Sequence, residues 1–210
     1  LKAVLRQAGF TGRIEATLEQ RLGRRLDMPL ADLGRNLWFD ILTGPNNDDA
    51  CAGCHSPTAG FGDTQSISIG IDSNEVVGPH RAGPRNMRRP PMVINSAFYP
   101  RLMWNSRFAA LSGDPFDNRV GFQFPPPEGS TLSSQGHLLT AQAFIPPTER
   151  NEVAGFDFIG DNDAIRAEVI HRLNATSAYQ KLFAKSFRAV KAGAPITYGM
   201  FAQAIAEFEF

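Results

Sequence analysis

Two cysteines and a histidine form the pattern with the narrowest chemical use in this chain. Cys51, Cys54 and His55 lie in the segment CAGCH, a CxxCH sequence that is typical of covalent attachment of a c-type haem. Their spacing places the two thiols about one helical turn apart, where each can form a thioether bond to a porphyrin vinyl group. The histidine that follows can bind the iron as its proximal ligand. We therefore predict one covalent haem c on this chain.

Two other uses of a CxxC pair fit the sequence less well. A dithiol redox site is expected between a strand and a helix, whereas this pair follows the turn-rich segment TGPNNDD at 43–49. A zinc site needs about four ligands. The chain has 2 cysteines in all, and its other histidines, His80, His137 and His171, do not cluster near them in sequence. If both cysteines carry haem, none is left for a disulfide.

The composition is that of a globular chain and excludes several classes of function. With 210 residues, 42% of them hydrophobic, the chain can bury one substantial core or two small ones. Its 21 basic and 21 acidic residues balance, so it lacks the basic excess that a nucleic-acid surface normally shows. No apolar run approaches the roughly 18 residues that a membrane-spanning helix needs. We expect neither a nucleic-acid partner nor a membrane span.

The haem motif also predicts where the protein works. Covalent c-type haem is installed outside the cytoplasm, so we expect a periplasmic protein or one in an equivalent compartment. The chain begins at Leu1 and shows no signal peptide, which we interpret as a mature or trimmed product. Its last segment, AQAIAEFEF at 202–210, is apolar and lacks a C-cap, which favours a chain that continues or docks on a partner.

Apolar spacing predicts helices near both ends of the chain. Towards the N-terminus the pattern favours helices over 11–25 and 30–39, with Trp38 in the core. A short helix should carry the two cysteines. Towards the C-terminus we expect three more helices, and their predicted caps are, in order, Asp161 or Asn162, Ser177 and Thr197.

The middle third of the chain is predicted to form long loops. Glycine and proline concentrate there, and ordinary packed helices are disfavoured by both residues. Long, well-anchored loops suit a domain that wraps around a large group such as a haem. The predicted fold class is therefore mostly α, a c-type cytochrome domain with long loop extensions.

Further blocks of sequence occur in an order that is specific to one family. In chain order they are LGRNLWFD at 33–40, CAGCH at 51–55, GPRN at 83–86, VINSAF at 93–98, MWNSR at 103–107 and TERNEV at 148–153. They resemble the bacterial di-haem cytochrome c peroxidases, whose superfamily includes the MauG-type maturation enzymes. The resemblance covers about residues 30–210 and the N-terminal, peroxidatic half of such an enzyme. It implies that 1–210 is a single haem domain and that a second haem c domain lies outside this chain.

The resemblance implies roles for individual residues. Glu152 resembles the carboxylate that moves a proton between the two oxygens of hydrogen peroxide, and Glu149 is the nearest alternative. Trp104 is similar to the tryptophan that helps electrons cross between the two haems. Arg107 is implied as an anchor for its loop or for a haem propionate. Asn86 resembles an asparagine that binds calcium, for which an amide oxygen is a suitable ligand.

The distal side of the iron differs from that of many relatives. Many of these peroxidases carry a histidine shortly after a Ser-x-Gly sequence, and it caps the iron in the resting state. Here the match is SIG at 68–70, but Ile71 follows and cannot bind iron. His80 lies nearby and is the candidate distal ligand in its place. Otherwise we predict an iron that is open to peroxide on this face.

These features lead to a functional hypothesis with two alternatives. The hypothesis is a peroxidase-type oxidoreductase that reduces hydrogen peroxide to water, with electrons from a donor protein that pass through the second haem. The first alternative is a MauG-type oxidase that acts on a side chain of another protein. The second is a mono-haem electron-transfer cytochrome, with an iron held by His55 and one of three methionines, Met87, Met92 or Met103. The segment 113–140 resembles an insertion that shapes the peroxide channel or meets the second domain.

Overall fold

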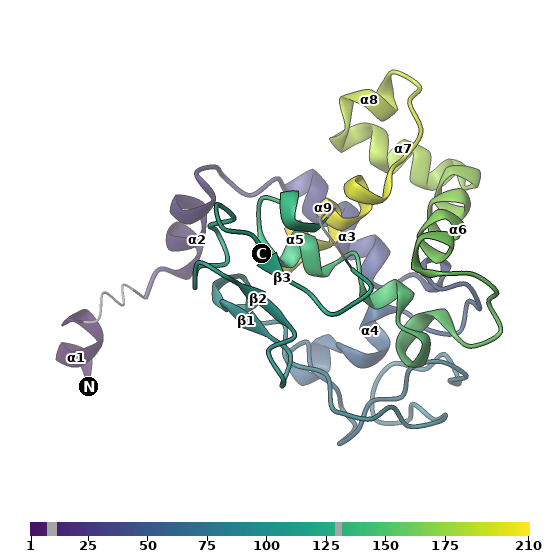
Figure 1. Cartoon of the computed structure of the whole chain (residues 1–210), viewed down its shortest axis with the longest axis horizontal. Coiled ribbons are helices and arrows are strands. Elements are labelled where there is room, and N and C mark those ends of the chain that lie inside the picture. The colour runs from purple at the N-terminus through teal and green to yellow at the C-terminus, as the bar shows by residue number, and fades with distance from the viewer. Residues whose placement is uncertain (8–11, 129–131) are drawn as a thin grey trace.

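The computed structural model describes residues 1–7, 12–128 and 132–210, and the fold is mostly α, as predicted. Helices from the two ends of the chain pack together, and the loops, short turns and one small sheet of the middle section lie beside them (Figure 1). Within the described ranges, no helix is long and apolar enough to cross a bilayer. The helices are α1 (Lys2–Gln7), α2 (Ile14–Leu22), α3 (Met28–Trp38), α4 (Cys51–Cys54), α5 (Leu138–Gln142), α6 (Asn162–Ala175), α7 (Ser177–Ser186), α8 (Arg188–Lys191) and α9 (Tyr198–Glu209).

The N-terminal helices lie close to their predicted positions. α2 is shorter than the predicted range 11–25, of which Thr11 lies outside the described residues. It ends at Gly23, whose left-handed backbone has φ of 67°. α3 begins after Asp27, whose carboxylate accepts a hydrogen bond from a backbone amide of the first turn. Trp38, the last residue of α3, is buried as predicted.

α9 packs along α3 at the centre of the core (Figure 1). Leu33 and Leu37 of α3 and Phe201 of α9 are almost completely buried. The two helices approach so closely that a Cβ at Gly34 would collide with the carbonyl oxygen of Ala204. Glycine is required at this position because two backbones meet there.

Two of the three predicted C-terminal caps form, and one does not. Asp161 and Thr197 each accept a hydrogen bond from a backbone amide in the first turn of α6 and α9. Ser177, predicted as a cap, is instead the first residue of α7, and Thr176 precedes it. This prediction is wrong because Thr176 alone joins α6 to α7, and its hydroxyl donates back to the carbonyl of Arg172.

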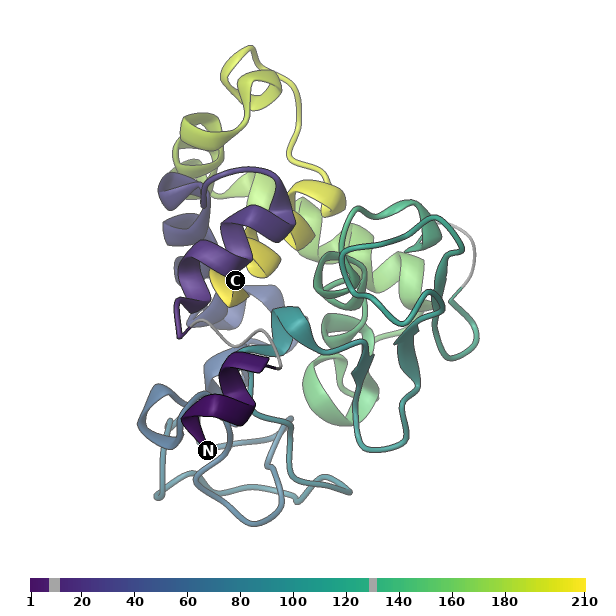
Figure 2. The same cartoon turned by 90° about the vertical axis from the view of Figure 1, so that its left-hand side faces the viewer.

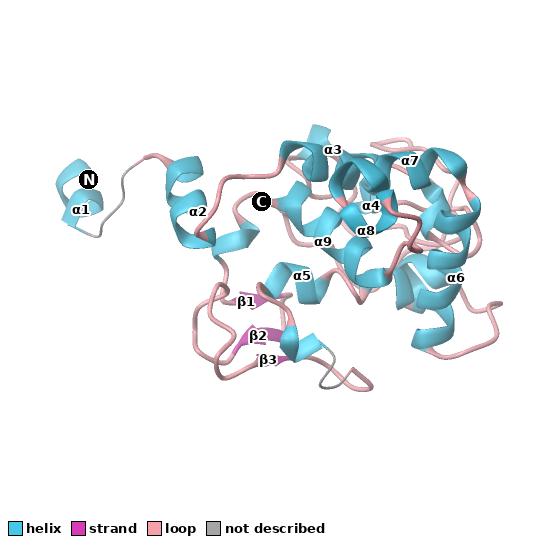
Figure 3. Cartoon of the chain, turned by 90° about the horizontal axis from the view of Figure 1, so that it is seen from above, coloured by secondary structure: helices cyan, strands magenta, loops and turns pink. Residues whose placement is uncertain are grey.

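Three short strands form an antiparallel sheet in the order β1 (Arg101–Leu102), β2 (Phe108–Ala110) and β3 (Phe122–Gln123). Leu102 pairs with Phe108, and Ala110 pairs with Phe122. Figure 3 shows the sheet beside α5 and away from α6 and α7. The predicted insertion 113–140 contributes β3 and the beginning of α5 to this region, and its residues 129–131 lie outside the described part of the chain.

A buried ion pair holds the long loop that follows α4. Arg81 is almost inaccessible and forms an ion pair with Asp49, which lies just before α4. The same guanidinium donates to the carbonyl oxygens of Ile69 at 2.7 Å and of Gly70 at 3.1 Å. Charge-assisted hydrogen bonds are strong where little water competes. Arg81 therefore ties the loop, one of those gathered at one end of the molecule in Figure 2, to the helix that carries the cysteines.

We predict that Gly34→Ala destabilises the domain, since the added methyl group meets the carbonyl of Ala204. The expected loss is about 1–3 kcal/mol in the free energy of unfolding, the usual range for an overpacked core. Gly136→Ala is the matched control, because a Cβ at Gly136 has no neighbour within 4 Å. Chemical denaturation of both variants measures the difference, and equal stabilities would contradict the close contact of α3 and α9.

Candidate functional site

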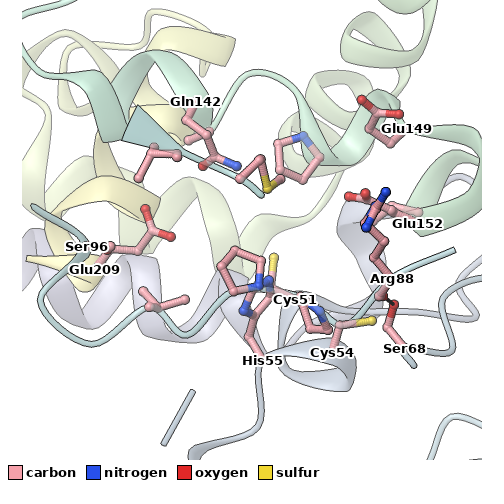
Figure 4. A pocket seen from close by; sticks show the side chains of 18 of the residues that line it. Cys51, Cys54, His55, Ser68, Arg88, Ser96, Gln142, Glu149, Glu152 and Glu209 are labelled. Carbon is pink, nitrogen blue, oxygen red and sulfur yellow. Dashed lines mark hydrogen bonds between the residues drawn. The ribbon is translucent and has the colours of Figure 1, made fainter. Parts of the chain in front are cut away.

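Cys51, Cys54 and His55 line a single cavity of about 470 Å³ (Figure 4). Both thiols are free of disulfide bonds. Burial raises the pKa of the Cys51 thiol to about 12, so an unmodified thiol here would be neutral. Much of the cavity wall is apolar, as a site for a porphyrin requires, and includes Val93, Leu102, Leu139, Phe201 and Ile205. The donor set and the lining fit a covalently attached haem.

The contacts of His55 suit the iron ligand that the sequence predicts. Its Nδ1 lies 3.2 Å from the carbonyl oxygen of Phe61, so that a neutral ring can donate from Nδ1 and keep Nε2 free for a metal. Burial lowers the pKa of His55, which favours this neutral form. Trp38 packs against the ring at 5.6 Å between centroids, and its indole N–H donates to the His55 carbonyl. Phe61 and Phe208 in turn contact Trp38.

The ion pair of Asp49 and Arg81 also explains the glycine inside the haem motif. A Cβ at Gly53 would collide with the Asp49 carboxylate and with the Arg81 guanidinium. Asp49 additionally accepts a hydrogen bond from the Ala50 amide at 2.8 Å, immediately before the first turn of α4. The Sγ of Cys54 lies 3.4 Å from the carbonyl oxygen of Ile69, in the loop that Arg81 holds. The buried ion pair of Asp49 and Arg81 thus holds α4 in place.

Glu152 lies in another wall of the same cavity, within a short π-helix at Arg150–Ala154. The guanidinium of Arg107 is 3.9 Å from its carboxylate and 3.2 Å from that of Glu149. Burial raises the pKa of Glu152 to about 7, and the charge of Glu149 adds to this rise while Arg107 opposes it. A carboxyl group with a pKa near 7 can both accept and return a proton at neutral pH.

Trp104 and Arg107 are placed on the connection between β1 and β2. Trp104 contributes to the cavity lining, yet 87% of its surface is exposed. The guanidinium of Arg107 lies over the ring of Phe108, 5.1 Å from its centroid, and forms ion pairs with Glu149 and Glu152. Its contacts support the anchoring role, while a contact with a haem propionate remains a prediction.

Of the residues considered as further iron or calcium ligands, all but His80 line the cavity. Asn86 lines the cavity, but its side-chain oxygen accepts a hydrogen bond from the Met87 amide at 2.7 Å. In the described parts of the chain, no group of three or more histidine, cysteine or acidic residues could hold a metal ion, so calcium remains a prediction. His80 is exposed and is not brought to the cavity. The three candidate methionines do line it, namely Met87, Met92 and Met103.

The cavity also contains polar residues that the motifs did not reveal. Gln142, at the end of α5, points into it in Figure 4. Ser96 and Glu209 line it as well. Glu209 could have been found, because Phe201, Ile205 and Glu209 repeat every four residues and therefore share one face of α9. No local signal in the sequence marks Gln142 or Ser96.

Comparison with known proteins identifies the family. The model of the di-haem cytochrome c peroxidase family matches residues 29–210, which include the haem motif, Glu152 and α9. The chain therefore belongs to the di-haem cytochrome c peroxidase family. This membership supports haem c as the cofactor.

Individual relatives cover the chain to different extents. It is 26% identical to methylamine utilization protein MauG of Methylophilus methylotrophus over 166 residues, which are 79% of this chain and 36% of that protein. It is 33% identical to cytochrome-c peroxidase IdrP2 of Denitromonas iodatirespirans over 78 residues, 37% of this chain and 18% of that protein. The chain thus spans little more than a third of MauG.

The fold is shared with solved structures. The crystal structure of a MauG-like protein associated with microbial copper homeostasis superposes with a TM-score of 0.58 at 21% identity, covering 88% of this chain and 40% of that one. A variant of the di-haem peroxidase BthA from Burkholderia thailandensis superposes with a TM-score of 0.50 at 18% identity, over 88% of this chain and 39% of that one. At these identities the likeness establishes the architecture alone.

We predict one covalent haem per chain, attached through Cys51 and Cys54. A pyridine haemochrome assay and the intact mass should both show it, whereas the mass of the bare polypeptide would contradict the assignment. His55→Gly should retain the haem but change its absorption spectrum, because the axial nitrogen is lost. His80→Ala is the matched control and should leave the spectrum unchanged, since His80 is exposed and outside the cavity lining.

Proposed function

We propose that this chain is the peroxide-reducing haem domain of a two-haem oxidoreductase. Its reaction would be the reduction of hydrogen peroxide to two molecules of water, with two protons and two electrons consumed. The observation that carries the proposal is the position of Glu152, a half-buried carboxyl group with a pKa near 7 in the same cavity as Cys51, Cys54 and His55.

The residues of the cavity can perform the proton transfer that this reaction needs. When bound, the haem supplies an iron centre that takes up peroxide and exchanges electrons with it. Glu152 takes the proton from the inner oxygen of the peroxide and returns it to the outer oxygen, which leaves as water. Arg107 lies within 3.9 Å of this carboxylate, where its charge opposes the effect of burial. The amide of Gln142 can donate a hydrogen bond from another part of the wall.

The proposal extends to partners outside the chain. Electrons would come from a donor protein and a second haem c domain, and Trp104, exposed at the cavity, is the proposed point of entry. We place the protein in the periplasm or an equivalent compartment, where covalent haem is installed. Asn86 is proposed to contribute its side-chain oxygen to a calcium site that other groups complete.

A MauG-type oxidase is the second candidate. The alignment with MauG is more than twice as long as that with the peroxidase IdrP2, 166 against 78 residues. Both activities would use the same cavity, but the source of the electrons differs. A peroxidase takes them from a donor protein, whereas a MauG-type oxidase takes them from the side chain that it oxidises. A third candidate, electron transfer with a methionine ligand, would show as a low-spin spectrum that persists on reduction. An open iron face, which we expect, gives a high-spin ferric spectrum and ready cyanide binding.

Glu152→Gln in the full-length protein tests the proton transfer. The amide cannot take up and return a proton, so we expect the rate of reaction with peroxide to fall by about 10²–10⁴, the usual range for lost acid–base catalysis. Haem content and the spectrum should not change. Glu149→Gln is the matched control and should have a smaller effect. If Glu149→Gln is the more damaging change, the role belongs to Glu149.

The proton transfer by Glu152 should depend on pH. Glu152 accepts a proton only when ionised, so the wild-type rate should fall as the pH drops through about 7. This fall should be absent from Glu152→Gln. Stopped-flow measurements of the peroxide reaction between pH 5 and 9 would show both profiles. A wild-type rate that is flat across this range would argue against Glu152 as the proton acceptor.

Trp104→Ala tests the electron path. We expect slower transfer from the second haem, seen as a lower steady-state rate, while the first reaction with peroxide stays fast. Phe156→Ala is the control, because Phe156 is also a highly exposed aromatic residue but does not line the cavity. Equal steady-state rates for both variants would remove Trp104 from the path.

A further inference from the structure

Among the described residues, two buried polar atoms in the cavity wall lack a hydrogen-bond partner. The Oγ of Ser96 and the Oε2 of Glu209 are buried, and within the described residues neither forms a hydrogen bond. Both residues line the cavity that contains Cys51 and His55, and only 6% of the Ser96 surface is exposed. Leaving a buried polar group unpaired costs about 1–3 kcal/mol, so water or a ligand normally satisfies such groups.

The geometry of α9 directs Glu209 into the cavity. Phe201, Ile205 and Glu209 follow one another at four-residue spacing and all line its wall. The other acid of this helix end, Glu207, forms an ion pair with Arg24 instead. The two glutamates therefore differ. The charge of Glu207 is neutralised by Arg24, whereas Glu209 faces the cavity in which the reaction is proposed to occur.

The surroundings of Glu209 favour its protonated form. Burial alone raises its pKa to about 8, with no resolved contribution from a cation. Glu152 differs in this respect, because Arg107 opposes the effect of burial there. A protonated carboxyl group is a hydrogen-bond donor as well as an acceptor, and can hold a proton at neutral pH.

The proton requirement of the reaction gives this carboxyl group a task. Reduction of one peroxide to two waters takes up two protons from outside, in addition to the two electrons from the donor. Glu152 only relocates a proton that the peroxide already carries. Figure 4 shows the carboxyl group of Glu209 on the opposite side of the cavity from Glu152, so it does not duplicate that role. The consumed protons need another carrier.

We propose that Glu209 is this second proton carrier and that, together with the hydroxyl of Ser96, it holds the water through which protons enter the cavity. The inference rests on the proposed reduction of peroxide. It gives the two unpaired polar atoms of Ser96 and Glu209 a function. Glu152 would move a proton within the peroxide, and Glu209 would supply protons from outside the cavity.

Infrared difference spectroscopy of the haem-loaded, full-length protein tests the inference without relying on turnover. A protonated carboxylic acid has a carbonyl band that is distinct from that of a carboxylate. We expect a component of this band at neutral pH that disappears in Glu209→Gln, whereas the component from Glu152 remains. Ser96→Ala should shift the band, because the hydrogen bonding of the carboxyl group changes. Glu15→Gln, at an exposed acid of α2, is the matched control and should leave it unchanged.

Kinetics provide the second measurement. Glu209→Gln should lower steady-state peroxide reduction at least tenfold while the first reaction with peroxide keeps its wild-type rate. Glu152→Gln should slow that first reaction, so the two variants fail at different steps. Glu15→Gln should match the wild type in both.

Several outcomes would overturn the inference. Absence of a Glu209-dependent band would show that the group carries no proton, and full turnover in Glu209→Gln would show that the proton is not used. A changed haem reduction potential with unchanged turnover would assign Glu209 to a hydrogen bond with the haem instead. If the wild-type protein does not reduce peroxide, the proposed function fails and the inference fails with it. A protein that reduces peroxide but lacks the band removes the inference alone.

Discussion

The contact between α3 and α9 is the constraint on which the site depends. Gly34 allows the two backbones to meet, and each helix then contributes to the cavity from a fixed position. α3 places Trp38 against His55, and α9 supplies the row of residues that ends at Glu209. Because both walls are set by one helix pair, a change in the spacing of these helices would alter the support of His55 and the position of Glu209 together.

The remaining walls come from loops, which need other means of fixation. Arg81 holds its loop with a buried charge pair and with hydrogen bonds to carbonyl oxygens. Gly70, one of the residues so held, packs against the backbone of Asn151 and Glu152 so closely that a Cβ would collide there. The haem-attachment helix and the segment of the proposed acid–base residue therefore rest on one anchored loop, although they are far apart in sequence.

Features encoded within a few residues were predictable, and those that depend on distant contacts were not. The haem motif, the caps at Asp161 and Thr197 and the mostly α class follow from local patterns. By contrast, Asp49 and Arg81 meet across 32 residues, and nothing near either one marks the pair. His80 was a candidate distal ligand because it follows the Ser-x-Gly match at 68–70, but it lies on the surface. Gln142 enters the site only through the packing of α5.

The turn that carries Trp104 has a consequence for recognition. Met103 and Ser106 both adopt left-handed backbone conformations, with φ of 66° and 57°, although neither is glycine. Each such residue costs about 1–2 kcal/mol relative to ordinary backbone. The free protein already contains this strain, so the backbone that carries Trp104 is set before any partner binds, although the indole itself is open to solvent. Binding of a partner over Trp104 would therefore cost little backbone entropy in this turn, which favours specific recognition by a small contact surface.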